Sequence, residues 1–320
     1  MRPSTALVAI AVINASSAAA APARAEPNCP GRRPLADVPA DGETVDYLGR
    51  VYSADDYATV KAAELDAFGA GLHLELDRAF ETRGSKYFAI AYRVDEAKMR
   101  ELERLLDAFY AQVYPRYFDC ELGEVIHVIY YDTRAEFVRL TDSDAYGFYV
   151  RDSKTISTYG RSGHGTLWHE LMHAFLDQNL ACTPPEWLDE GLASFYEMAF
   201  LKDGQVVEGF TNWRLPYLKE AIRKGELEPL ARFLADDEIR STGGLALARF
   251  LFLYLWVHDA LVPFVRTWVT EICPIGNSVE RNDRAVQTLE ELLGMDLATI
   301  EQNMKSLARK VKVNQKLTQE

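Results

Sequence analysis

The sequence predicts an α+β fold, in which a lobe built on a mixed β-sheet is followed by a helical lobe. Strand-like and helical segments alternate in the first half of the 320-residue chain, whereas almost every segment after Thr166 has helical periodicity. Hydrophobic residues make up 48% of the chain and charged residues 26%, so the protein can bury a sizeable core and is not disordered.

The N-terminal residues predict an exported protein. Arg2 precedes an apolar stretch over residues 6–13, and residues 23–25 read Ala-Arg-Ala, a cleavage pattern for a signal peptide over residues 1–25. The apolar stretch is too short to span a membrane. Cleavage after Ala25 would remove two arginines and no acid, so the net charge would change from −13 to −15. We expect a periplasmic or secreted protein without a membrane span, and its acidity argues against a nucleic-acid partner.

Residues 26–85 are expected to form an N-terminal arm and helices. The arm is rich in Pro and Gly and has no apolar periodicity. Ser53 and Asp56 form a capping-box-like helix start. Gly69 and Gly71 predict an interruption of that helix.

The sheet lobe is predicted from segments rich in β-branched and aromatic residues. The expected strands are Tyr87–Val94, Val125–Tyr131, Phe148–Val150 and Thr155–Tyr159, of which the last two form a hairpin. A helix that begins at Asp95 places five apolar residues on one face: Met99, Leu102, Leu105, Leu106 and Phe109. A short helix over Thr133–Leu140 follows the second strand. Such alternation predicts a mixed sheet.

The chain has four cysteines, which are widely separated and form no CxxC pair. This spacing excludes zinc-finger, thioredoxin-like and iron–sulfur sites. An exported protein would pair them as two disulfides, for which three connectivities exist. We favour Cys182 with Cys273 and Cys29 with Cys120, because the first pair would tie the segment after the helix of residues 169–173 to the C-terminal helices.

Residues 169–173 read His-Glu-Leu-Met-His, an HExxH motif. Positions i and i+4 of a helix project from one face, so His169 and His173 can bind one Zn²⁺ ion, while Glu170 can act as general base toward the attacking water. An apolar stripe lies beside the two histidines, as a partly buried active-site helix requires. The stripe consists of Leu167, Leu171, Ala174 and Phe175.

A catalytic zinc needs a third protein ligand. A metzincin extension is excluded, because Leu176 and Asn179 stand where that motif requires Gly and a ligand. Among the acids that follow, Glu186 has the position of a capping-box residue at a helix start. We favour Glu190, which lies opposite the apolar stripe of that helix. Asp189, about 100° further round the helix, is its competitor.

Together, the HELMH motif and the segment Trp187–Glu197, which reads WLDEGLASFYE, resemble the gluzincin metallopeptidases. The likeness is to the bacterial peptidase-MA-like proteins related to aminopeptidase N, and it covers roughly residues 85–270. The resemblance implies a two-lobed, thermolysin-like fold in residues 86–320, with one zinc ion between the lobes. It also implies Glu190 as third ligand and hydrolysis of a peptide or protein substrate with Glu170 as general base.

The chain departs from the aminopeptidase pattern in one place. Residues 241–244 read Ser-Thr-Gly-Gly where relatives carry an oxyanion-stabilising Tyr, and the possible substitutes are Tyr159, Tyr217, Tyr254 and His258. No GxMEN-type segment is present, so aminopeptidase specificity is not implied. Two alternatives stay open: an exported binding or scaffold protein with a degenerate or structural zinc site, and another zinc hydrolase of the same fold.

Several polar positions near the motif have two interpretations. Asp177, Ser194 and Glu197 could orient ligand side chains or could face solvent. The strand Thr155–Tyr159 is a candidate edge for pairing with an extended substrate.

Overall fold

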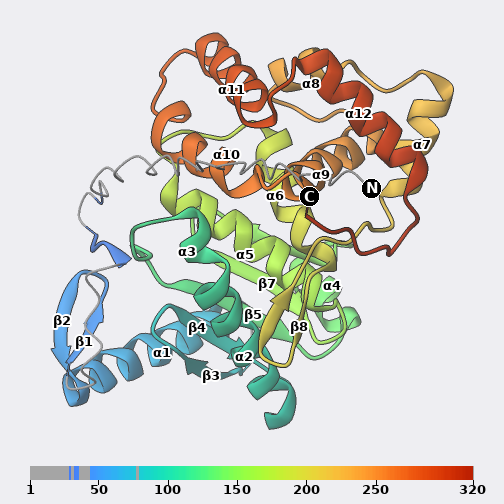
Figure 1. Ribbon diagram of the computed structural model, residues 1–320. Coiled ribbons are helices and arrows are strands. Elements are labelled where there is room, and N and C mark those ends of the chain that lie inside the picture. The colour runs from blue at the N-terminus through green and yellow to red at the C-terminus, as the bar shows by residue number, and fades with distance from the viewer. Residues whose placement is uncertain (1–28, 30–31, 36–43, 77–78, 320) are drawn as a thin grey trace, which may run out of the picture.

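The protein has a mixed α+β architecture, as the sequence predicts. A computed structural model describes Cys29 and residues 32–35, 44–76 and 79–319. The expected signal peptide and most of the expected arm lie outside these residues. Figure 1 shows the main sheet in the lower half of the view and the C-terminal helices α7–α12 in the upper half, with α5 and α6 between them.

Strands and helices alternate along the first half of the chain. They are β1 (Thr44–Tyr47), β2 (Arg50–Ser53), α1 (Ala54–Leu76), β3 (Glu81–Gly84), β4 (Phe88–Tyr92), α2 (Glu96–Gln112), α3 (Tyr114–Tyr117), β5 (Ile126–Tyr131), α4 (Arg134–Thr141), β6 (Gly147–Val150) and β7 (Thr155–Tyr159). The second half is mainly helical. Its elements are α5 (His164–Asn179), α6 (Glu186–Phe195), the 3₁₀ turn η2 (Tyr196–Met198), β8 (Phe200–Lys202), β9 (Gln205–Val207), α7 (Leu215–Lys224), α8 (Leu230–Ala235), α9 (Thr242–Val257), α10 (Leu261–Thr267), the π-helical η3 (Trp268–Ile272), α11 (Ser278–Leu293) and α12 (Leu297–Lys310).

The main sheet has five strands in the order β3-β4-β5-β7-β6. β4, β5 and β7 are parallel neighbours, with Ile90 opposite Val128 and Val128 opposite Ile156. β3 and β6 pair antiparallel on the two outer sides. The expected hairpin is therefore confirmed. The strand next to the HExxH helix, β7, is nevertheless internal, so the predicted edge at Thr155–Tyr159 is wrong and the edge on that side is β6.

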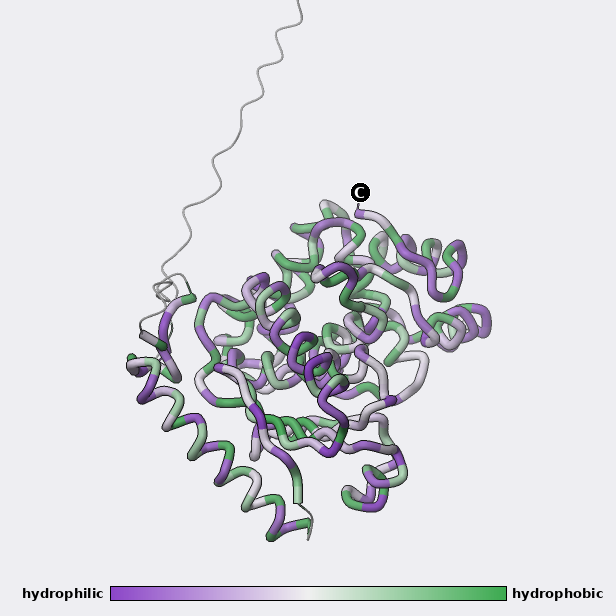
Figure 2. Tube along the Cα trace, turned by 90° about the horizontal axis from the view of Figure 1, so that it is seen from below, coloured by the Kyte–Doolittle hydropathy of each residue, from purple (hydrophilic) through white to green (hydrophobic). Residues whose placement is uncertain are grey.

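Helices cover both faces of this sheet. On one face Ile90, Val128 and Ile156 pack against the buried sides of α2 and α5. On the other face Ile129 and Tyr131 pack against side chains of α1 and α4. The sheet interior is correspondingly apolar, and the central strands are largely green in Figure 2, whereas the outer helix α1 alternates between purple and green. The sheet thus provides a rigid base on which α5 is held.

The capping and periodicity of α2 agree with the sequence prediction. Asp95 is its N-cap and accepts a hydrogen bond from the Lys98 amide, and the five predicted apolar residues are buried. Ser53 likewise accepts a hydrogen bond from the amide of Asp56 at the start of α1.

The secondary structure differs from the sequence prediction at two places. First, α1 continues without interruption through Gly69 and Gly71. A Cβ at Gly69 would lie 3.0 Å from the Thr82 side chain, so that glycine lets β3 pack closely on an unbroken helix. Second, the chain after Thr166 is mainly helical, as expected, but it also contains the β8–β9 hairpin. Its turn residues, Asp203 and Gly204, both have positive φ, as a two-residue hairpin turn requires.

Helix α9 forms the centre of the helical part. Its residues from Ala246 to Leu255 are buried, and it packs against α6. Gly191 of α6 makes this packing possible, because a Cβ there would lie 2.6 Å from the Phe252 ring. Arg249, fully buried on α9, donates hydrogen bonds to the carbonyl of Ser194 at 2.9 Å and to that of Phe210 at 2.6 Å. These contacts fix the position of α6.

The structure contains the two disulfides that the sequence analysis favours, Cys29–Cys120 and Cys182–Cys273. They fit an exported protein, since disulfides persist in oxidising compartments. Within the described residues, no single helix is both long and apolar enough to cross a membrane. In the part of the chain that the structure describes, one pair, α9 and the segment Leu261–Ile272, passes that test together, and its two members are bent by 113° relative to each other.

The two disulfides should stabilise the protein equally but affect the site differently. Each closes a loop with a sequence separation of 91, so replacing either pair by serine should lower the free energy of unfolding by about 2–5 kcal/mol. Of the two pairs, Cys182–Cys273 has a cysteine within the connector between α5 and α6, so its loss should weaken metal binding more than loss of Cys29–Cys120 does. Urea unfolding and metal titration of both double variants test this. Equal metal affinity in the two variants would contradict it.

Candidate metal centre

Helix α5 carries the HExxH motif, and its opposite side is fixed in the core. Trp168 donates a hydrogen bond from Nε1 to the carbonyl of Leu105, at 3.2 Å, and its ring stacks on Phe109 with centroids 4.9 Å apart. Phe175, two turns further on, also stacks with Phe109, with centroids 5.9 Å apart. The buried aromatic residues therefore determine which way the two histidines point.

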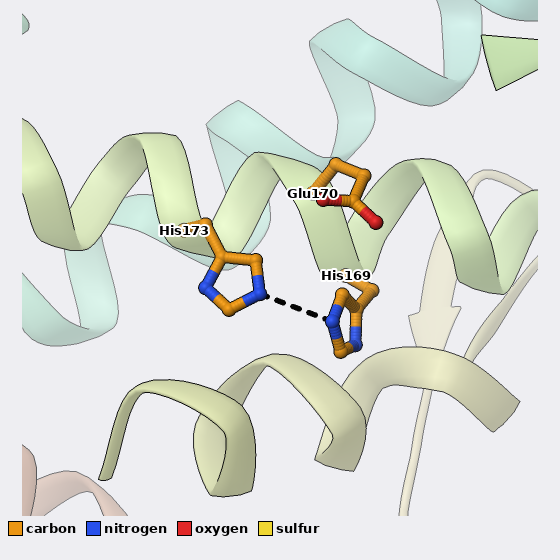
Figure 3. Close-up of side chains that lie close together, drawn as sticks. All are labelled: His169, Glu170 and His173. Carbon is orange, nitrogen blue, oxygen red and sulfur yellow. Dashed lines mark hydrogen bonds between the residues drawn. The ribbon is translucent and has the colours of Figure 1, made fainter. Parts of the chain in front are cut away.

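The imidazole rings of His169 and His173 project from one side of α5, as Figure 3 shows. Their Nε2 atoms lie 3.0 Å apart, and the side chains are 12% and 13% exposed. Neutral imidazole nitrogens facing each other at this distance can share a cation, and a tetrahedral metal separates neighbouring ligand atoms by about 3.4 Å.

Two carboxylates lie near these nitrogens. Glu190, on α6, has one oxygen 3.7 Å from His169 Nε2 and the other 3.8 Å from His173 Nε2. Glu170, on α5, offers a carboxylate oxygen within 4.8 Å of the histidine nitrogens. The group His169, Glu170 and His173 could therefore hold a metal ion, and Glu190 faces the same point from the neighbouring helix.

The burial of the two acids favours different roles. Glu170 is only 7% exposed, and burial raises the pKa of its carboxyl, whereas the Glu190 side chain is 33% exposed. A ligand must be ionised, while a general base works best when its pKa lies near the working pH. This contrast agrees with Glu190 as ligand and Glu170 as base.

The outer nitrogen of each histidine faces an acid from the segment that follows α5. The Nδ1 atom of His173 lies 2.7 Å from Asp189 Oδ1, in hydrogen-bonding geometry. The Nδ1 atom of His169 lies 3.3 Å from Glu197 Oε1. Carboxylates in these positions can fix the ring orientation and direct each Nε2 toward a metal ion bound between the histidines. Asp189, the competitor for third ligand, therefore contacts a histidine on its outer side. Glu197 likewise faces a histidine and not solvent, since its side chain is 13% exposed.

Glu197 is itself held by two residues that the sequence analysis does not single out. Arg214 Nη2 lies 2.6 Å from Glu197 Oε1, and Asn212 donates a hydrogen bond to Glu197 Oε2 at 2.8 Å. Burial alone would raise the pKa of Glu197, but the contacts with His169 and Arg214 lower it to about 2. Glu197 is thus an anion at neutral pH and can balance charge on His169.

In the absence of a metal, His173 binds its proton tightly. Burial acts to lower the pKa of His173, but the hydrogen bond and negative charge of Asp189 raise it to about 9. The pKa of Asp189 is lowered in turn by His173 despite its own burial. A metal ion must therefore displace the proton from Nε2, after which Nδ1–H can still donate to Asp189.

Other residues singled out in the sequence have structural roles. Glu186 accepts a hydrogen bond from the amide of Ile239 at 2.7 Å. The N-cap residue of α6 is Pro185, and no side chain caps the helix, so the predicted capping box is wrong. The side chain of Asp177, 7% exposed, binds Tyr149 and Lys154, at 2.8 Å each, and does not orient a histidine in this arrangement. The hydroxyl of the buried Ser194 donates to a carbonyl of its own helix.

Two hollows meet at His169 and Glu170. The first, of about 390 Å³, also contains His173, Asp189 and Glu190, together with residues of the edge strand β6 and Arg151. The second, of about 980 Å³, extends from the start of α5 to Trp213. The candidate oxyanion residues Tyr159, Tyr217, Tyr254 and His258 are not among the described residues that line either hollow. The tyrosines found there are Tyr146 and Tyr149.

Gly165 permits the close contact between α5 and Glu197. A Cβ at this position would lie 1.8 Å from the carbonyl oxygen of Glu197. Because this oxygen belongs to the backbone, it can move away only if the chain around Glu197 shifts. We expect Gly165→Ala to lower the free energy of unfolding by about 1–3 kcal/mol and to weaken metal binding, because Glu197 would shift away from His169. Urea unfolding and metal titration measure both effects.

The matched control for this variant is Gly71→Ala in α1, where an added Cβ meets no atom within 4 Å. That substitution should raise the free energy of unfolding by up to about 1 kcal/mol. A Gly165→Ala protein as stable as wild type would show that α5 and η2 are not packed as described.

Fold and site together define a mixed α+β protein with a candidate metal centre formed by two helices. The chain matches no known family model and no curated protein sequence.

Proposed function

We propose that the protein is an exported zinc-dependent metallopeptidase of the gluzincin type. The observation that carries the proposal is the convergence of three ligand atoms: two histidine Nε2 atoms 3.0 Å apart and the Glu190 carboxylate at 3.7 and 3.8 Å from them. Their spacing suits a tetrahedral site with one position left for water or substrate. In this proposal the sheet lobe and the helical lobe of residues 86–320 are the two lobes of a thermolysin-like fold.

The donor set itself favours zinc. Two imidazoles and one carboxylate form the His₂Glu set of catalytic zinc sites, and each imidazole has a carboxylate on its outer nitrogen. When bound, zinc would polarise the scissile carbonyl and lower the pKa of water to about 7.

The chain's own residues would perform the proton transfers. Glu170 lies at the junction of the two hollows, where it can accept a proton from the attacking water and pass it to the leaving amine. Asp189 and Glu197 would hold the histidines in place during this exchange. The edge strand β6 could pair with an extended peptide through main-chain hydrogen bonds, which would lay the peptide across both hollows.

The test combines metal analysis with a cleavage assay. The full chain is purified without chelator, its zinc content is measured, and a peptide library is digested with and without 1,10-phenanthroline. We expect one zinc per chain and cleavage that the chelator abolishes and added zinc restores. Stoichiometric zinc without cleavage of any peptide would favour the exported binding or scaffold protein, or another zinc hydrolase. Absence of zinc would overturn all three.

A further inference from the structure

The larger of the two hollows beside the HExxH motif has a mainly apolar wall. It begins at His169 and Glu170 and runs along the N-terminal end of α5, with a volume of about 980 Å³. Most of its lining surface is apolar. The apolar residues come from three separate segments, and they are Ala145, Tyr146, Met198, Ala199, Phe200 and Trp213.

Three large aromatic side chains of this wall are exposed. Tyr146 is 64% exposed, Trp213 is 55% exposed and Phe200 is 37% exposed. A soluble protein rarely gathers large apolar side chains around one open hollow unless they contact a ligand or partner. When two aromatic rings pack against each other, the contact contributes more binding free energy than the buried apolar area alone would give.

The polar side chains of the wall already have partners. Arg214 pairs with Glu197 and also lies over the ring of Trp213, 4.5 Å from its centroid. His164 Nε2 lies 3.3 Å from Glu101 Oε1, and the hydroxyl of Ser162 is hydrogen-bonded to Thr158 at 2.7 Å. Outside the HExxH motif, the ionisable side chains among the described lining residues are His164, Glu197 and Arg214, and each already contacts a basic or acidic partner. A charged substrate group entering this hollow would lose water without gaining a free counter-ion.

We infer that this hollow binds a large apolar side chain of the substrate, aromatic or branched, next to the bond that is cleaved. Continuity with His169 and Glu170 places the occupant beside the reacting groups, and the volume is ample for a Phe, Trp or Leu side chain. The inference rests on the proposed peptidase function and adds a substrate class to it. Trp213 and Tyr146 are the residues that would determine this preference.

A binding measurement tests the inference without catalysis. The probes are blocked peptides of sequence acetyl-Ala-Ala-Xaa-Ala-Ala-amide with Phe, Leu, Ala or Glu at Xaa, titrated into the zinc-loaded full-length Glu170→Gln protein. We expect the Phe and Leu peptides to bind about tenfold or more tightly than the Ala and Glu peptides. Trp213→Ala, added to Glu170→Gln, should remove this preference, and so should Tyr146→Ala if the Trp213 variant fails to fold. Leu74→Ala, at a side chain 86% exposed on α1, should leave the preference unchanged.

Cleavage by the wild type separates this inference from the proposed function. If the wild type cleaves a random peptide library with a preference for Phe, Trp or Leu beside the scissile bond, and Trp213→Ala abolishes that preference, the result supports both the pocket and the peptidase. Trp213-dependent binding of Phe peptides without cleavage of any peptide supports the pocket and overturns the peptidase. Cleavage with equal preference for Ala, Glu and Phe, or equal binding of all four probes, overturns the pocket.

Discussion

Replacing Glu170 by glutamine should leave the metal bound and lower the rate of peptide hydrolysis by about 10²–10⁴-fold or more. The amide has the size of the carboxyl but cannot accept the proton of the attacking water. In the metal-free protein, burial raises the pKa of Glu170. The ionised carboxylate therefore lowers the free energy of unfolding at neutral pH, whereas the neutral amide of glutamine does not. The variant is therefore expected to fold at least as well as wild type.

Zinc content, kcat/KM on a cleaved peptide and the urea midpoint are measured together for this variant. Glu280→Gln on α11 is the control, because it makes the same chemical change on an exposed helix. A Glu170→Gln protein that keeps both zinc and full activity would place the general base elsewhere. Loss of zinc together with activity would instead make Glu170 a ligand.

Local patterns were sufficient to predict most of the sheet lobe. The capping residue Asp95 and the five apolar positions of α2 follow from helix period alone, and β5 follows from its β-branched and aromatic run. Gly69 misled the prediction, because its role depends on the distant residue Thr82 rather than on its neighbours. The pair Asp203 and Gly204 is a strong turn signal, but the strands β8 and β9 have only three residues each, so their sequences alone do not predict the hairpin.

Within the site, sequence spacing predicts which side chains share one face of a helix. It cannot predict which side chains two separate helices bring into contact. That His169 and His173 share a face follows from the i, i+4 rule. The contact of Glu197 with His169, and the support of Glu197 by Arg214, depend on how η2 and the start of α7 pack against α5. Segments this far apart in sequence carry no local pattern for such contacts, so the acids could be named as candidates but not assigned to histidines.

The neighbouring acids of α6 provide the sharpest test of the ligand set. Glu190→Gln should lower zinc affinity by about 10²-fold or more, since it removes the negative charge of the carboxylate whose two oxygens face the two Nε2 atoms. Asp189→Asn should lower zinc affinity by only about 10–100-fold, because Asp189 contacts the outer nitrogen of His173 and acts through its orientation. Competition with a chelator of known affinity measures both values.

The two substitutions differ by one position on the same helix and remove the same charge, so each serves as the control for the other. Asp189→Asn should also lower the pKa of His173 in the metal-free protein, because the carboxylate is what raises that pKa against the effect of burial. Histidine NMR titration follows this shift independently of zinc. If Asp189→Asn lost zinc more completely than Glu190→Gln, Asp189 would be the third ligand, and α6 would have to rotate by about 100° from its present position to present it.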